Sequence, residues 1–103
     1  MGATARFAAK EYRQGKDLLL AVCDEECLGQ DYQEGKLRLR VEPGFYDGRR
    51  IGEDEFEVAM QRATIANLVG KRTVAAAIRM GLVAEENVLS IAGVPHAQWA
   101  LLF

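Results

Sequence analysis

Histidine, tryptophan, proline and cysteine are scarce in this sequence. The 103 residues include one histidine, one tryptophan, two prolines and two cysteines. Two cysteines are too few for a disulfide framework, and charges interrupt residues 1–16 where a secretory signal needs an apolar segment. No apolar run approaches the roughly 20 residues of a membrane helix. We therefore expect a cytoplasmic protein with reduced thiols and no membrane partner.

An excess of positive charge is also absent. The chain carries 13 lysines and arginines against 15 aspartates and glutamates, a net charge of −2. A basic field over the whole surface is thereby excluded, so any contact with nucleic acid has to come from a local patch. The length fits one domain over residues 1–103, large enough for a hydrophobic core without metal or disulfides.

Hydrophobic patterning predicts three strands, then two helices, then one or two further strands. The predicted strands cover residues 3–9, 18–23, 36–41 and 87–93, with a final strand or extended tail over 96–103; the predicted helices cover 53–69 and 71–80. The first two strands form a hairpin across Gly15, and one helical turn follows Asp24. This order predicts an α+β fold, a mostly antiparallel sheet of about four or five strands with two helices packed on one face.

The scarce residues gather in "GVPHAQW", positions 93–99. Along a strand, His96 and Gln98 point to one face and Trp99 points to the other, so we expect Trp99 in the core and His96 opposite. The ordinary pKa of imidazole makes His96 a candidate general acid or base, or a ligand-binding group, and Gln98 adds a second hydrogen-bonding group. The alternative is that His96 only bonds a backbone carbonyl and Pro95 ends the preceding strand.

The segment "VGKRT", positions 69–73, lies between the two predicted helices. Gly70, Lys71 and Arg72 would place two cations at a helix N-terminus, where free N–H groups favour an anion. A phosphate-binding P-loop is excluded, because its first glycine would stand where the chain has Ile65. The alternative is an ordinary turn with a solvated basic pair.

The cysteines do not form a metal motif. Cys23 and Cys27 are separated by three residues, and structural zinc sites favour closer pairs and four ligands. Cys23 ends an apolar strand, where a thiol is usually inert. We therefore expect no metal and no cofactor.

Nucleic-acid contact has one candidate surface. The helix pair resembles a helix-turn-helix, but its second helix is mostly alanine and aliphatic, so sequence-specific DNA binding is not expected. Basic side chains beside aromatic ones suit RNA, through neutralised phosphates and stacked bases. The candidates are Arg38, Arg40, Arg49 and Tyr46. In the alternative, Phe45 and Tyr46 fold back over the core.

Several strings spread over residues 17–98 are distinctive in combination. They are "LAVCDEECLG" at 20–29, "FYDG" at 45–48, "ATIANLVGK" at 63–71 and "NVLSIAGVPHAQ" at 87–98. With them the chain resembles an archaeal family of small uncharacterised proteins, the domain-of-unknown-function 424 family. The resemblance implies an archaeal, cytosolic setting and no established activity. The family pattern does not require a cysteine at Cys27, which counts against a paired-thiol site.

Together these features predict a non-enzymatic binding module for RNA or a protein partner in information processing. The alternative is a small enzyme or anionic-ligand binder centred on His96, with Lys71 and Arg72 holding the anion. The sequence contains no recognisable set of catalytic nucleophile, base and acid, and this favours the binding module over the enzyme. A pocket joining His96, Gln98 and a cation would favour the enzyme, and a basic face with exposed aromatics would favour the binder. The sequence leaves the oligomeric state open.

Overall fold

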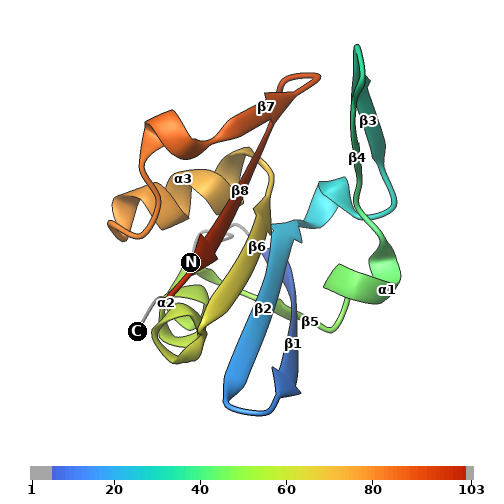
Figure 1. Cartoon of the computed structure of the whole chain (residues 1–103). Coiled ribbons are helices and arrows are strands. Elements are labelled where there is room, and N and C mark those ends of the chain that lie inside the picture. The colour runs from blue at the N-terminus through green and yellow to red at the C-terminus, as the bar shows by residue number, and fades with distance from the viewer. Residues whose placement is uncertain (1–5, 102–103) are drawn as a thin grey trace, which may run out of the picture.

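The computed structural model describes residues 6–101, which form one six-stranded sheet, a separate two-stranded hairpin and several helices. The strand order in the large sheet is β5-β1-β2-β6-β8-β7 (Figure 1). The strands are β1 (Phe7–Gln14), β2 (Asp17–Asp24), β3 (Asp31–Glu34), β4 (Leu37–Arg40), β5 (Arg49–Ile51), β6 (Ile65–Val69), β7 (Leu89–Ile91) and β8 (Val94–Ala100). The helices are α1 (Pro43–Tyr46), α2 (Glu53–Arg62) and α3 (Lys71–Arg79), with 3-10 turns η1 (Glu25–Cys27) and η2 (Glu85–Asn87).

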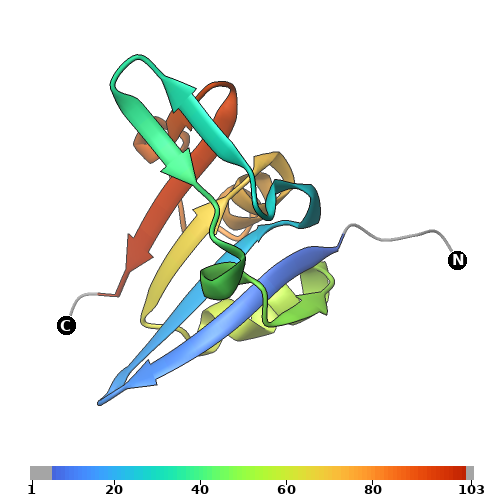
Figure 2. The ribbon, with the colours of Figure 1, turned by 90° about the vertical axis from the view of Figure 1, so that its right-hand side faces the viewer.

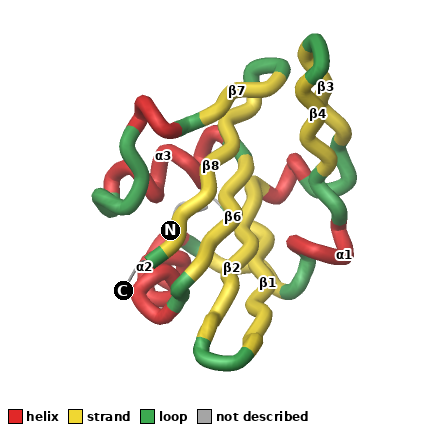
Figure 3. Tube along the Cα trace, in the orientation of Figure 1, coloured by secondary structure: helices red, strands yellow, loops and turns green. Residues whose placement is uncertain are grey.

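The predicted α+β class is confirmed, but the sheet is larger than predicted and mixed. It has six strands, and β2 and β6 pair in parallel while the other neighbours pair antiparallel. Helices α2 and α3 lie on one face of this sheet, and α1 and the β3–β4 hairpin lie on the other (Figures 1 and 3). No helix within residues 6–101 is long and apolar enough to cross a membrane.

The prediction of one helix over residues 53–69 was wrong at its C-terminal end. Helix α2 stops at Arg62, and the chain re-enters the sheet as β6 between β2 and β8. The segment has apolar groups for both faces of a central strand: Leu68 enters the core under the helices, and Val69 enters the cluster on the opposite face. Thr64 fixes the entry, because its Oγ1 accepts a hydrogen bond from the Leu18 N–H at 2.9 Å.

Short turns join three of the strand pairs. The hairpin across Gly15 is confirmed, but its first strand covers Phe7–Gln14 and not residues 3–9, of which 3–5 lie outside the described residues. The same two-residue arrangement recurs at Gly35 between β3 and β4. Residues 31–34, which were predicted to lie outside any strand, therefore form β3. Between β7 and β8 both turn residues have positive φ, 52° at Ala92 and 81° at Gly93, as a type I′ turn requires. Because that turn ends at Gly93, Pro95 lies within β8 instead of ending the strand before it.

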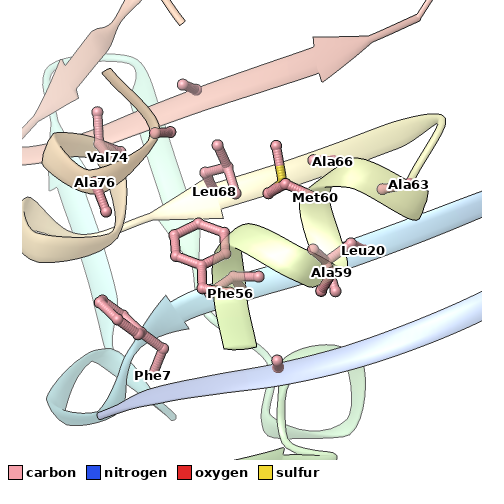
Figure 4. Packing of buried hydrophobic residues seen from close by; sticks show 14 of the residues in the cluster. Phe7, Leu20, Phe56, Ala59, Met60, Ala63, Ala66, Leu68, Val74 and Ala76 are labelled. Carbon is pink, nitrogen blue, oxygen red and sulfur yellow. The ribbon is translucent and has the colours of Figure 1, made fainter. Parts of the chain in front are cut away.

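The main hydrophobic core fills the space between the sheet and the two longer helices (Figure 4). Phe56 on α2 is fully buried, and its ring centroid lies 5.3 Å from that of Phe7 on β1. A second cluster lies on the opposite face, where α1 and the β3–β4 hairpin cover β1, β2 and the end of β6. These covering elements leave the lower parts of β6 and β8 without a ribbon in front of them (Figure 2).

Candidate binding surface on strands β6, β7 and β8

The stretch "GVPHAQW" forms most of strand β8, and its two faces divide as predicted. Ala97 is buried in the core under the helices, and Trp99 packs against the same core while staying half-buried. His96 and Gln98 alternate with them and lie on the opposite face, paired across β6 with Val69 and Asn67.

His96 is half-buried between uncharged neighbours. Its register partners are Val69 on β6 and Leu89 on β7. Burial lowers the pKa of its imidazole, and no hydrogen bond with another described residue contributes to that shift. The alternative of a histidine held by a backbone carbonyl therefore finds no support, and neither does a histidine activated by a carboxylate.

The side chains around His96 form a surface that we call the uncharged face. In the middle of this face, Gln98 Nε2 donates a hydrogen bond to Asn67 Oδ1 at 3.0 Å. The face also carries Leu89, which is 47% exposed. A hollow of about 220 Å³ lies at residues 65–67 of β6 and 98–100 of β8. The uncharged face comprises Ile65, Asn67, Leu89, His96, Gln98 and Ala100.

The N-terminus of α3 is closed from inside the protein. Asp24, buried at the end of β2, accepts hydrogen bonds from the N–H groups of Arg72 at 3.1 Å and Thr73 at 2.8 Å, and from the Thr73 hydroxyl at 2.7 Å. Gly70 has a φ of 112°, and a Cβ there would lie 2.6 Å from Asp24 Oδ1. The predicted anion site thus lacks the free N–H groups of Arg72 and Thr73 on which it depended.

The two cations beside that helix end do not meet His96. The Arg72 guanidinium donates to Glu26 at 2.6 and 3.0 Å and to the Arg6 carbonyl at 3.1 Å, and this contact holds the pKa of Glu26 below its usual value. Lys71 is exposed and lines a hollow of about 290 Å³ with Pro95. Pro95 and His96 are consecutive strand residues and point to opposite faces, so the predicted pocket of His96, Gln98 and a cation does not form.

The predicted RNA surface is largely neutralised. Arg38 pairs with Asp31 through two hydrogen bonds, at 3.0 and 2.5 Å, and Arg40 pairs with Glu42 at 2.9 Å. Arg50 bonds Glu25 at 2.8 Å. Each of these cations already has an acidic partner, which reduces the attraction for a phosphate.

The aromatic residues of this region fold back over the sheet. Tyr46 is 5% exposed, and the Phe45 ring stacks on Tyr12 with centroids 5.2 Å apart. Tyr12 in turn donates a hydrogen bond to the Phe45 carbonyl at 2.7 Å. The alternative prediction, that Phe45 and Tyr46 fold back over the core, is confirmed. Arg49 is exposed, but no exposed aromatic ring of this loop accompanies it.

Both thiols are buried. Burial, with the nearby Cys27 and Asp24, raises the pKa of Cys23 to about 12, and burial also raises the pKa of Cys27. Such thiols stay protonated at neutral pH and are poor nucleophiles. Among the residues that the structure describes, no three His, Cys, Asp or Glu side chains gather as a metal site would need.

Three residues of this region were not predicted from the sequence in the roles that they have here: Asp24 as the cap of α3, and Asn67 and Leu89 on the uncharged face. A strand over residues 65–69 would have placed Asn67 on one face with Ile65 and Val69, but this segment was predicted as part of a helix. Asp24 was assigned to the turn that follows it, but it makes no side-chain cap there. Its real partners lie 48 and 49 positions later in the chain, a separation that local pattern does not encode.

The buried imidazole predicts a stability change near neutral pH. Because the folded pKa of His96 lies below 6.5, the unfolded chain takes up this proton first as the pH falls. The free energy of unfolding should therefore decrease from about pH 7.5 to about pH 5.5, and this contribution should level off below the folded pKa. Urea unfolding across this range measures it, and His96→Gln should flatten the dependence. An equally steep dependence in His96→Gln would assign it to other groups.

A solved structure from an archaeon shares this fold. The structure of an uncharacterized conserved protein from Methanopyrus kandleri, an archaeon, matches with a TM-score of 0.79 and 26% identity, covering 95% of this chain and 93% of that one. No curated protein matches the chain. The model of the family described as "Protein of unknown function (DUF424)" matches residues 12–102. With nearly its whole length matched, the chain belongs to the DUF424 family.

Proposed function

We propose that the chain is a non-enzymatic binding module whose partner is a protein that docks on the uncharged face. The observation that carries this proposal is the absence of charge from all six residues of that face, in a chain where 27% of residues are charged. The cores of protein interfaces are depleted in charged residues in the same way.

The exposure of the face supports this assignment. Leu89 is 47% exposed, and Gln98 and Ala100 are exposed beside it. Exposed apolar side chains that gather on one surface are a feature of interaction sites. Here α1 and the β3–β4 hairpin cover only the other part of this sheet face (Figure 2). The Asn67–Gln98 amide pair has donor and acceptor groups left over for a partner, which gives specificity.

A partner of ordinary affinity has to reach beyond these six residues. Stable interfaces bury about 800 Å² on each protein. The β3–β4 hairpin stands on the same side of the sheet and carries Leu37, which is 44% exposed (Figure 2). A complementary partner would be apolar at its centre and would extend toward this hairpin.

The alternatives fit the geometry less well. An RNA surface needs unpaired cations, and Arg38 and Arg40 have carboxylate partners. A general acid or base needs a reacting group within hydrogen-bond reach together with a second catalytic group, and His96 has apolar register neighbours.

Site-specific photocrosslinking tests the proposal with a matched pair of positions. Leu89 on the uncharged face and Val58 on α2 are both branched aliphatic residues, and their exposed fractions are similar, 47% and 54%. Val58 lies beside the charged residues Arg49, Asp54 and Glu55. A benzoylphenylalanine probe at each position is irradiated in lysate of the source organism, with and without nuclease, and products are identified by mass spectrometry.

The expected result is one protein crosslinked from position 89, unchanged by nuclease and absent from position 58. Purified, that protein should bind the unmodified chain. Crosslinking that disappears with nuclease would contradict the proposal in favour of RNA. Equal products from both positions, or no product from position 89, would contradict it as well.

A further inference from the structure

Strand β8 has an open outer edge over its second half. On its inner side β6 pairs with it from His96 to Ala100. On its outer side β7 pairs only with Val94, Pro95 and His96. Within the described residues 6–101, residues 97–100 therefore have a strand neighbour on one side alone.

The register shows which backbone groups face outward. Leu101 N–H donates to the Thr64 carbonyl at 2.8 Å, and Gly70 N–H donates to the Pro95 carbonyl at 2.9 Å. Odd-numbered residues of β8 thus direct their backbone groups toward β6, and even-numbered ones direct theirs away. Past the end of β7 these are Gln98 and Ala100, both exposed. Each offers one N–H and one carbonyl to a further strand.

This edge lacks the charged residues and the proline that protect many exposed strands. Natural edges are blocked by lysine, proline, bulges or inward charges. The sequence "AQWAL" at 97–101 contains no charge and no proline. The edge at the other end of the sheet differs, because β5 carries Arg49 and Arg50. An unprotected edge of this kind is a template for strand addition.

We propose that two copies of this chain associate through β8 in antiparallel pairing, with Gln98 opposite Ala100 of the second copy and Ala100 opposite its Gln98. This register is symmetric about Trp99, as a two-fold dimer requires. In this register the N–H and carbonyl groups of Gln98 and Ala100 all find a partner in each copy. The pairing ends before His96, because β7 occupies the outer side of β8 at that residue. It joins the two six-stranded sheets into one.

Side chains favour the same register. Trp99 would face its counterpart in a pair without hydrogen bonds, where cross-strand side chains come closest and aromatic pairs stabilise the sheet. Trp99 packs against the core but is only half-buried, so ring surface remains to be covered. Leu101, 45% exposed, lies beside it. The second copy is the favoured occupant because the uncharged edge meets an identical uncharged edge with no repulsion.

The pairing does not depend on the proposed function. The pairing uses the backbone edge of β8. The side chains of the uncharged face point away from the plane of the joined sheet and stay accessible to a partner. Failure of either proposal therefore leaves the other to be judged by its own experiment.

Sedimentation equilibrium of the full chain measures the association from about 1 µM to about 500 µM. We expect a reversible monomer–dimer equilibrium. The emission of Trp99, which is the only tryptophan, should shift to shorter wavelength as the dimer forms. A wild-type chain that stays monomeric over this whole range, or forms only larger aggregates, would overturn the proposal.

Two double variants test the register with matched charges. Gln98→Glu with Ala100→Glu places like charges opposite each other in both cross-strand pairs. Gln98→Glu with Ala100→Lys places opposite charges there at the same two positions. The first should weaken dimerisation at least about tenfold, and the second should leave it at or above the wild-type affinity. Equal affinities of the two variants would overturn the register.

Two proline variants test the edge itself. Ala100→Pro removes an outward N–H of β8, and Ser90→Pro removes an outward N–H of β7, the alternative edge. Circular dichroism during thermal unfolding shows whether each variant is folded. Loss of the dimer in folded Ala100→Pro but not in Ser90→Pro is the expected result. The reverse pattern would overturn the proposal, and if a proline variant does not fold, the two charge variants decide.

Discussion

Replacing Asp24 by alanine should lower the free energy of unfolding by about 3 kcal/mol. The Asp24 carboxylate is 3% exposed and accepts three hydrogen bonds, from the N–H groups of Arg72 and Thr73 and from the Thr73 hydroxyl. Alanine would leave these donors without a partner at the N-terminus of α3, where Thr73 is fully buried. Urea unfolding monitored by circular dichroism measures the loss.

Glu26→Ala is the matched control. Glu26 is a second carboxylate bonded to Arg72, but its side chain is 62% exposed. Exposed ion pairs contribute little, so the change should stay below about 1 kcal/mol. Similar losses for Asp24→Ala and Glu26→Ala would contradict the assignment of Asp24 as the cap that fixes α3 to the sheet.

Replacing Gly70 by alanine should cost about 3 kcal/mol or more, because two effects add. The φ of 112° at Gly70 is one that residues with a Cβ rarely adopt, and the new Cβ would lie 2.6 Å from Asp24 Oδ1. The double variant Gly70→Ala with Asp24→Ala should lose less than the sum of the single losses, because the contact with the Asp24 carboxyl group is removed. The 2.8 Å contact with the Cβ of residue 24 and the backbone strain both remain, so the double variant should still be less stable than Asp24→Ala alone.

Gly44→Ala is the control for that experiment. Gly44 lies in α1, its φ is not positive, and nothing lies within 4 Å of a Cβ placed there. We expect a change within about 0.5 kcal/mol in the same urea unfolding experiment. A mild effect of Gly70→Ala, comparable to that of Gly44→Ala, would mean that the β6–α3 junction can rearrange.

Local pattern predicted the parts of the fold that depend on local contacts. The hairpin across Gly15 and the helix over 71–80 follow from turn chemistry and from the glycine at each end of that helix. Residues 65–69 could not be assigned in this way. A short apolar run after an amphipathic helix fits either state, and its pairing with both β2 and β8 decides for a strand.

The candidate site was predicted only where strand alternation was sufficient. Alternation places His96 and Gln98 on one face, which the register confirms. It could not identify Asn67, because that residue was assigned to a helix. Arg38 was predicted to contact RNA, but its ion pair with Asp31 was not predicted, since residues 31–34 were not assigned to a strand.

The most direct test of the account compares the affinity of the crosslinked protein partner for two charge variants. Leu89→Arg places a cation on the uncharged face, and Val58→Arg places one on α2. Titration calorimetry with the purified partner should give at least about tenfold weaker binding for Leu89→Arg and unchanged binding for Val58→Arg. Weakening by Val58→Arg as strong as by Leu89→Arg would contradict the account. So would binding that survives Leu89→Arg but is lost when Arg38→Glu and Arg49→Glu are combined.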